Sequence, residues 1–308
     1  MQTQGKRFLV TGGAGFVGSH IVDRLLAAGA AEVVVLDLAP RETHLGDALA
    51  TGKVRLEAGD VGDRARLAEV FEGIDGLFHA AVLPLNNCTE DPRKCLEVNV
   101  DGTFNVFDAA REAGVRKIVF SSASSVYGDT NSTMDESHPL GARSWYGASK
   151  ICGEAFLHAL GTQTGIEYVI LRYMNVYGPR QDAGLVRLVL NRINSGQPPI
   201  ITGDGSASFD FVHVADVAEA NVRSMASDLS GIEINVGSGG EASVKEIVGH
   251  LLRLTGSELE PEYRPAPNAA MFRRVGSNER MVELLGWEPE HDLDAGLKTV
   301  IDHVAATT

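Results

Sequence analysis

A glycine-rich segment near the N-terminus constrains the fold more than any other part of the sequence. The apolar run Phe8–Val10 is followed by Gly12, Gly15 and Gly18, and then by the amphipathic run Ile21–Gly29. This order predicts a buried strand, a tight turn and a helix. Glycines at such a turn let the backbone approach a pyrophosphate, whose charge faces the free N–H groups of the helix start. We therefore predict a phosphate-binding turn.

An acidic residue strengthens this prediction. A second apolar run, Val33–Leu36, ends in Asp37, which lies 19 residues beyond Gly18. A carboxylate at about this distance binds the ribose of a dinucleotide. The alternative is a buried turn that packs a helix on a sheet and binds nothing.

Composition excludes several classes of function. The 308 residues are enough for two lobes, and the formal net charge of −14 disfavours nucleic acid or an anionic membrane as partners. No apolar run approaches the roughly 18–20 residues of a membrane span. The first strand begins by residue 7, which leaves no room for a signal peptide. Cys88, Cys95 and Cys152 lack zinc-site spacing, so we expect reduced thiols, a cytoplasmic location and no metal.

Strands and helices alternate through the first part of the chain. The expected strands are continuous apolar runs, which is typical of a parallel sheet covered on both faces. We therefore predict an α/β fold, with a Rossmann-type doubly wound parallel sheet in residues 1–172. Residues 173–308 are expected to form a smaller mixed α/β substrate lobe, and a segment of them could return to the sheet. Ligands of such sheets bind beyond the carboxyl ends of the strands.

Tyr146 and Lys150 are the best candidates for catalysis. They are four residues apart at the start of an expected helix, so they share one helix face. A tyrosine with its ordinary pKa near 10 is a poor base at neutral pH, but a neighbouring ammonium group favours the phenolate. Such a pair can take a proton from an alcohol whose carbon loses hydride. The alternative is a chance spacing on a surface helix.

At this point the chain resembles the extended short-chain dehydrogenases/reductases, of the NAD-dependent epimerase/dehydratase type that acts on nucleotide sugars and includes UDP-glucose 4-epimerases. The matching segments run in order along nearly the whole chain: Thr11–Gly18, Asp37, Gly59 and Asp60, Phe78–Ala81, Asn99, Phe120–Ser122, Val126–Gly128, Tyr146–Lys150, Leu171–Tyr173, Asn175–Pro179, Asp210–Val214, and Leu284–Trp287 with Pro289.

The resemblance implies a cofactor site for NAD. Its expected residues are Gly12, Gly15, Phe16 and Val17 at the pyrophosphate, Asp37 and Leu38 at the adenosine ribose, Asp60 and Val61 at the adenine, Ala80 and Ala81 along the channel, and Asn99, Ser121, Tyr146, Lys150 and Tyr173 around the catalytic end. The Asp37 carboxylate repels a 2′-phosphate and so favours NAD over NADP. Arg41 nearby leaves NADP as an alternative. His79 and His213 are expected to be packing residues.

The catalytic hydroxyl is the first departure from the family. A serine or threonine usually stands three residues before the valine of the family's Val-Tyr-Gly, where this chain has Ala123. We expect Ser124, and as second choice Ser122, to bind the reacting oxygen, because alternate side chains of an extended strand share a face. Ser124 and Ser125 also replace the acidic pair of the family's dehydratases, which argues against dehydration and decarboxylation.

The substrate site is the second departure. Asn175 is expected to contact the substrate, but Phe209 replaces the arginine that grips the diphosphate in many relatives. Arg187 or Arg273 could supply that charge, as could Arg192 or Arg274, although each could equally be a solvated surface residue.

The resemblance implies C4 epimerisation of a UDP-hexose or UDP-hexuronic acid through a 4-keto intermediate. The alternatives are a reductase or dehydrogenase acting on an NDP-keto-sugar or another alcohol, and a protein that binds NAD without catalysis. The family commonly forms homodimers through two helices of each subunit, which here would be about Asp91–Ala113 and Trp145–Gly161. Burial against the sheet explains their apolar residues equally well.

Overall fold

The computed structural model describes residues 2–128, 130–265 and 273–307. Its centre is a seven-stranded sheet with the order β11-β6-β5-β4-β1-β2-β3, in which every neighbouring pair is parallel. The strands are β1 (Arg7–Thr11), β2 (Glu32–Asp37), β3 (Val54–Ala58), β4 (Gly76–His79), β5 (Lys117–Ala123), β6 (Glu167–Tyr173) and β11 (Ile232–Val236). The predicted Rossmann-type sheet is confirmed.

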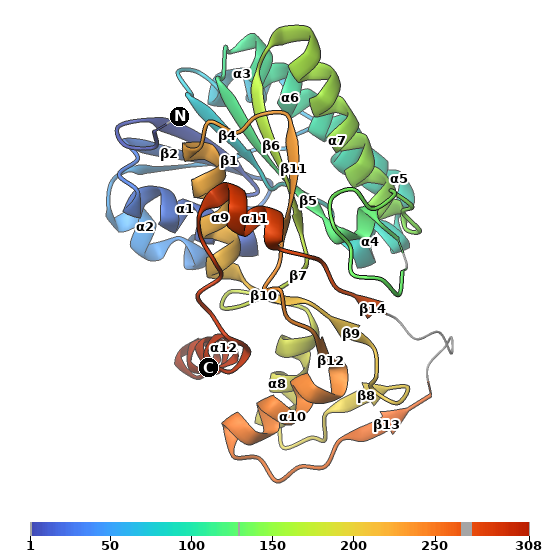
Figure 1. The fold of residues 1–308 in the computed structure, drawn as a ribbon. Helices are drawn as coiled ribbons and strands as arrows, with labels where there is room; N and C mark the ends of the chain where they lie inside the picture. The colour runs from blue at the N-terminus through green and yellow to red at the C-terminus, as the bar shows by residue number, and fades with distance from the viewer. Residues whose placement is uncertain (1, 129, 266–272, 308) are drawn as a thin grey trace.

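Helices cover both faces of the sheet, as Figure 1 shows. On one face lie α1 (Phe16–Ala27), α2 (Gly46–Ala50), α9 (Val214–Ala226) and α11 (Glu279–Leu285), and on the other α3 (Arg64–Val70), α6 (Thr103–Glu112) and α7 (Trp145–Thr164). Strand alternation explains the two layers, because Phe8 and Val10 of β1 enter the first core while Leu9 enters the second. β11, α9 and α11 come from beyond residue 172, so later segments return to this sheet.

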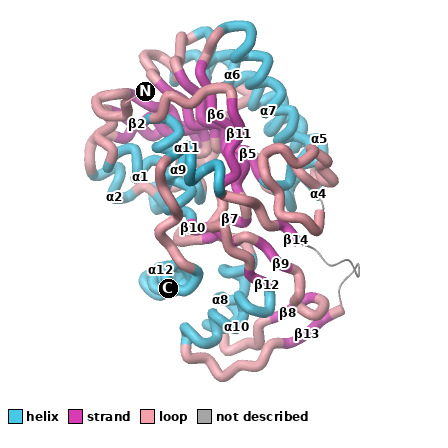
Figure 2. The backbone as a smooth tube through the Cα atoms, viewed as in Figure 1, coloured by secondary structure: helices cyan, strands magenta, loops and turns pink. Residues whose placement is uncertain are grey.

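The smaller lobe lies below the sheet in Figure 2, and it has its own apolar core. It is built from α8 (Leu185–Asn194), α10 (Val244–Thr255), α12 (Leu293–Thr307), β8 (Ile200–Thr202), β9 (Ser208–Phe209), β12 (Ala242–Ser243), β13 (Glu262–Arg264) and β14 (Arg273–Arg274). At the junction of the lobes, β10 (Phe211–His213) pairs in parallel with β7 (Asn175–Tyr177). Within the described residues, no helix has the length and apolar character needed to cross a membrane.

The long helix expected over 91–113 is confirmed, because α5 (Pro92–Leu96), a π-helical turn η2 (Glu97–Gly102) and α6 follow one another without a break. A separate short helix, α4 (Leu85–Glu90), precedes it. The break before α5 has a local cause, because Asp91 caps that helix through the Lys94 N–H and Pro92 cannot continue a preceding one. The short 3-10 turns η1 (Glu42–His44) and η3 (Ser124–Val126) complete the chain.

The expectation of three reduced thiols is wrong. Cys88 of α4 and Cys95 of α5 form a disulfide, and Cys152 of α7 is free. The turn between the two short helices brings the two cysteine Cα atoms to 4.8 Å, which a single continuous helix would not do.

Candidate active site

The glycine turn forms a cradle at the carboxyl edge of the sheet. Gly12 has φ +68°, and a Cβ atom there would lie 2.7 Å from the Ala81 backbone. A Cβ atom on Gly18 would lie 2.2 Å from the Gly12 carbonyl oxygen, so α1 packs directly on the turn. Gly15 caps α1, whose first residues Phe16 and Val17 are half-buried. The absence of side chains on these glycines would let a pyrophosphate come close to the backbone N–H groups at the start of α1.

Asp37 lies beside this cradle, at the end of β2. Its carboxylate accepts hydrogen bonds from the N–H groups of Ala14, at 3.2 Å, and Ala39, at 3.3 Å. Leu38 next to it is exposed, and Arg41 forms an ion pair with Asp182 beyond β7. The guanidinium group that we considered for an NADP phosphate is therefore engaged with a carboxylate.

The other expected cofactor residues surround the same edge. Ala80 and Ala81 follow β4, and the Ala81 N–H faces the Thr11 hydroxyl at 3.4 Å. Asp60 accepts a hydrogen bond from the Gly62 N–H at 2.8 Å, and Val61 is buried against Gly102.

Tyr146 and Lys150 lie on the face of α7 that packs on the sheet. The Ser144 hydroxyl caps this helix by accepting from the Gly147 N–H. The Lys150 ammonium donates to the Ser121 carbonyl at 2.7 Å and lies 5.7 Å from the centre of the Tyr146 ring. The predicted pair is therefore brought together beside the end of β5.

Burial dominates the electrostatics of this pair. It lowers the pKa of Lys150 to about 7, while the charge of Glu154 acts to raise it. Burial, with a smaller contribution from Tyr173, raises the pKa of Tyr146 to about 12. Without an added positive charge, Tyr146 is thus a protonated phenol at neutral pH. A cationic nicotinamide ring would lower its pKa and favour the base.

The serine cluster differs from our expectation. β5 ends at Ala123 and η3 begins at Ser124, so the strand alternation that we used for Ser122 and Ser124 stops between them. The Ser122 hydroxyl donates to Glu154 at 2.5 Å in a buried network. The hydroxyl of Ser122, our second choice for the catalytic hydroxyl, is therefore already used in a hydrogen bond to Glu154. Ser124 is buried in the first turn of η3, and the Ser125 hydroxyl is buried without a partner among the described residues.

Asn99 and Tyr173 make internal hydrogen bonds. The Asn99 side chain accepts from the Leu83 N–H at 2.7 Å and donates to the Leu83 carbonyl and the Ser149 hydroxyl. It therefore fastens the segment after β4 to the catalytic helix. The Tyr173 hydroxyl bonds to Ser121 at 2.9 Å and to Asn221.

The expected substrate residues are dispersed at the lobe junction. Asn175 is exposed on β7, and its N–H donates to the Asp210 carbonyl. The Phe209 ring packs against Phe211, with ring centres 5.8 Å apart. Arg273 makes a two-bond ion pair with Glu241. Arg187 of α8 faces His303 of α12. The pKa of His303 is lowered by burial first, and then by the charges of Arg180 and Arg187.

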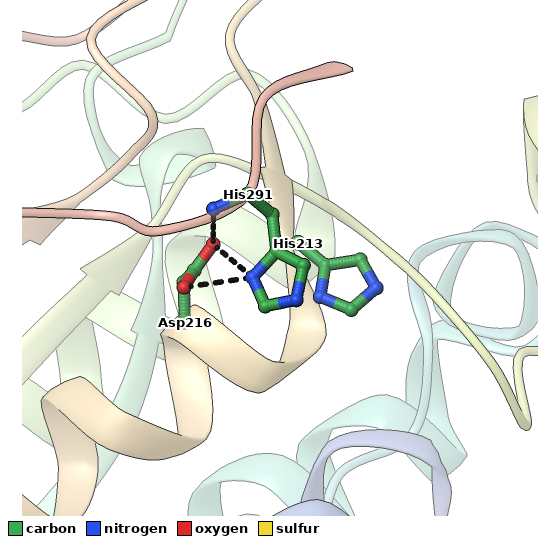
Figure 3. A group of neighbouring side chains, drawn as sticks. All are labelled: His213, Asp216 and His291. Atoms are coloured by element: carbon green, nitrogen blue, oxygen red, sulfur yellow. Dashed lines mark hydrogen bonds and ion pairs between the residues drawn. The ribbon is translucent and has the colours of Figure 1, made fainter. Parts of the chain in front are cut away.

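Sequence reasoning missed one group, His213, Asp216 and His291, which Figure 3 shows. Asp216 accepts from the N–H groups of Glu290 and His291 and from the His291 ring at 3.1 Å. The two imidazole rings stack with centres 4.1 Å apart, so their in-plane lone pairs run side by side instead of converging on an ion. The group fastens the loop before α12 to α9. Asp216 and His291 are 75 positions apart, so no local sequence pattern predicts their contact.

His79 is also a packing residue. Its ring nitrogens bond to the hydroxyls of Thr11, at 2.6 Å, and Thr103, at 3.0 Å. Burial and then the charge of Lys150 lower the pKa of His79 to about 3, so its ring is neutral.

Comparison with known proteins now identifies the family. The profile of the NAD dependent epimerase/dehydratase family matches residues 8–237. The chain belongs to this family. Its cofactor is accordingly NAD, and the glycine cradle with Asp37 is the part of the structure that fits it.

Relatives match along the whole chain. The putative UDP-glucose 4-epimerase of Methanocaldococcus jannaschii is 38% identical over 309 residues, covering 96% of this chain and 97% of the relative. The UDP-glucose 4-epimerase of Thermotoga maritima, solved with UDP-glucose, is 30% identical with a TM-score of 0.92, covering 98% and 99% of the two chains. The UDP-glucose 4-epimerase of Thermus thermophilus, solved with NAD, is 32% identical with a TM-score of 0.89, covering 98% and 100%.

Proposed function

We propose that the protein is an NAD-dependent epimerase that interconverts the C4 epimers of a UDP-hexose or UDP-hexuronic acid. The observation that carries this proposal is the Tyr146–Lys150 pair, held by the Ser121 carbonyl at the edge of the sheet that bears the glycine cradle. The full-length similarity to UDP-glucose 4-epimerases supports it.

Each residue of the site is given one role in this reaction. Bound NAD supplies the acceptor and donor of hydride. Tyr146 takes the proton of the C4 hydroxyl and returns it to the C4 oxygen after the 4-keto sugar has turned in the site. Lys150 favours the phenolate through its charge, and Ser124 donates a hydrogen bond to the reacting oxygen. Asn175, with Arg187, Phe209 or Arg273, is proposed to contact the nucleotide sugar.

A net reductase or dehydrogenase is the second candidate. It is favoured by Phe209, whose ring packs on Phe211 at the position where many relatives have an arginine. The test is to incubate the purified protein with UDP-glucose, UDP-glucuronate and UDP-N-acetylglucosamine. Conversion of one of them to its C4 epimer supports the epimerase. Consumption of NADH or NADPH by a keto sugar, without epimerisation, would support the reductase.

The replacement of Ser124 by alanine tests the proposed hydroxyl. We expect kcat to fall about 100-fold, because one hydrogen-bond donor to the reacting oxygen is lost. Ser125→Ala is the matched control, since it removes a neighbouring hydroxyl that is buried without a partner among the described residues. Its kcat should stay near that of the wild type. If Ser125→Ala were the damaging change, the donor would be Ser125.

A homodimer is expected across α5, η2, α6 and α7. Trp145 and Phe104 are 63% and 47% exposed, and Trp145 lines an apolar cavity of about 450 Å³ together with Leu96 and Cys152. Apolar surface of this kind is typical of an interface. The double variant Leu96→Glu/Phe104→Glu should sediment as a monomer. The control Leu188→Glu, at a 59% exposed position of α8, should leave the dimer intact. A monomeric wild type would contradict this proposal.

A cytoplasmic location is a proposal from the sequence alone. The Cys88–Cys95 disulfide bears on this proposal, because such bonds are rare in a reducing cytosol. Cell fractionation tests the location directly: recovery of the protein in the cytosolic fraction would support it, and recovery in another compartment would contradict it.

A further inference from the structure

A buried ion pair lies one helical turn beyond the catalytic lysine. Tyr146, Lys150 and Glu154 are spaced four residues apart, so they share one face of α7. Arg172 of β6 donates to both oxygens of Glu154, at 3.0 and 2.7 Å. The two side chains are only 4% and 3% exposed. An ion pair at this depth loses its hydration and adds little net stability, so stability alone does not explain it.

Glu154 attaches the end of β5 to the catalytic helix. It accepts a hydrogen bond from the Ser122 hydroxyl at 2.5 Å. One residue earlier, the Ser121 carbonyl accepts from the Lys150 ammonium at 2.7 Å. Two successive residues of β5 are thus fixed to α7, directly before the turn that carries Ser124.

Arg172 fixes the other end of that turn. Its guanidinium donates to the Tyr127 hydroxyl at 3.0 Å, and that hydroxyl donates to Asn235 of β11 at 2.7 Å. Tyr127 follows η3 directly. The turn with Ser124 is therefore held on both sides by one network, whose centre is the Glu154–Arg172 pair.

We propose that Glu154 is a positioning residue for the acid–base step: through Ser122 and Arg172 it fixes the turn that carries Ser124, and through its charge it keeps Lys150 cationic. The proposal rests on the roles proposed above for Tyr146 and Lys150.

The charges around Lys150 support the proposal that the charge of Glu154 keeps Lys150 cationic. Among the described residues, the titratable or charged groups that act on Lys150 are Tyr146 and Glu154 on α7 and His79 on β4, while Arg172 of β6 contacts Glu154 and Tyr173 of β6 contacts Ser121. His79 is neutral, and Glu154 is the group that raises the pKa of Lys150 against the effect of burial. Lys150 is cationic below its pKa and neutral above it. Loss of the Glu154 charge therefore lowers this pKa and leaves less of the ammonium at neutral pH.

The test is the pH profile of the Glu154→Gln variant. We expect kcat to fall about tenfold, and the alkaline limb of the kcat profile to move to lower pH by roughly one unit. The KM for the sugar should change less than about threefold, because Glu154 does not touch the substrate. Ser122→Ala removes a hydrogen bond but no charge, so it should lower kcat and leave the limb in place.

If Glu154→Gln does not fold, a second variant provides the test. Glu154→Gln/Arg172→Gln leaves no lone buried charge, and its alkaline limb should lie between those of Glu154→Gln and the wild type. A limb at the wild-type pH, in whichever of the two variants is folded, would overturn the proposal. Full activity of Tyr146→Phe would instead overturn the proposed acid–base roles, so the two failures are distinguishable.

Discussion

Replacing Tyr146 by phenylalanine is expected to lower kcat for epimerisation about 1,000-fold. The change removes only the hydroxyl group, which accepts the substrate proton and returns it. NAD binding should survive, since the glycine cradle and Asp37 are untouched. The measurement is kcat together with the NAD affinity of the same preparation.

Tyr263→Phe is the matched control for this change. It removes a phenol hydroxyl from β13, at a position that is exposed and lies in the smaller lobe. Its kcat should equal that of the wild type. Retention of activity in Tyr146→Phe would mean that another group moves the proton.

Replacing Gly18 by alanine is expected to abolish NAD binding. The new Cβ atom would lie 2.2 Å from the Gly12 carbonyl oxygen and 2.7 Å from the Gly13 Cα atom, so α1 must move away from the turn. Both contacts are with backbone, which cannot rotate aside as a flexible side chain could. We expect the free energy of unfolding to fall by about 3 kcal/mol, measured by denaturant titration without NAD.

Gly249→Ala is the control, because Gly249 lies in α10 with nothing within 4 Å of an added Cβ atom. Alanine at such a helical position should raise the free energy of unfolding by about 0.5–1 kcal/mol. NAD binding should not change. Wild-type NAD affinity in Gly18→Ala would show that the observed packing of α1 on the turn is not needed for the cofactor.

The parts of the site that were predictable depend on local spacing. The glycine turn and Asp37 lie within 26 residues of sequence, and the i, i+4 spacing alone places Tyr146 and Lys150 on one face. The alternation of strands and helices likewise predicts the parallel sheet, because each buried strand is a continuous apolar run.

The remainder depends on features without a local signal. The strand alternation that links Ser122 to Ser124 fails because β5 ends at Ala123 and a 3-10 turn follows, and no spacing rule predicts where a strand ends. Cys88 and Cys95 meet because a turn at Asp91 separates the short helix α4 from α5. The Glu154–Arg172 pair joins α7 to β6, a contact that follows from the packing of the helix on the sheet.

The most direct test of the account uses a UDP-sugar deuterated at C4. If hydride leaves C4 and returns to the same carbon within one active site, the epimerised product retains the deuterium at C4, and no reduced cofactor accumulates in proportion to product. Product that has lost the label, or stoichiometric NADH in place of epimer, would contradict the account.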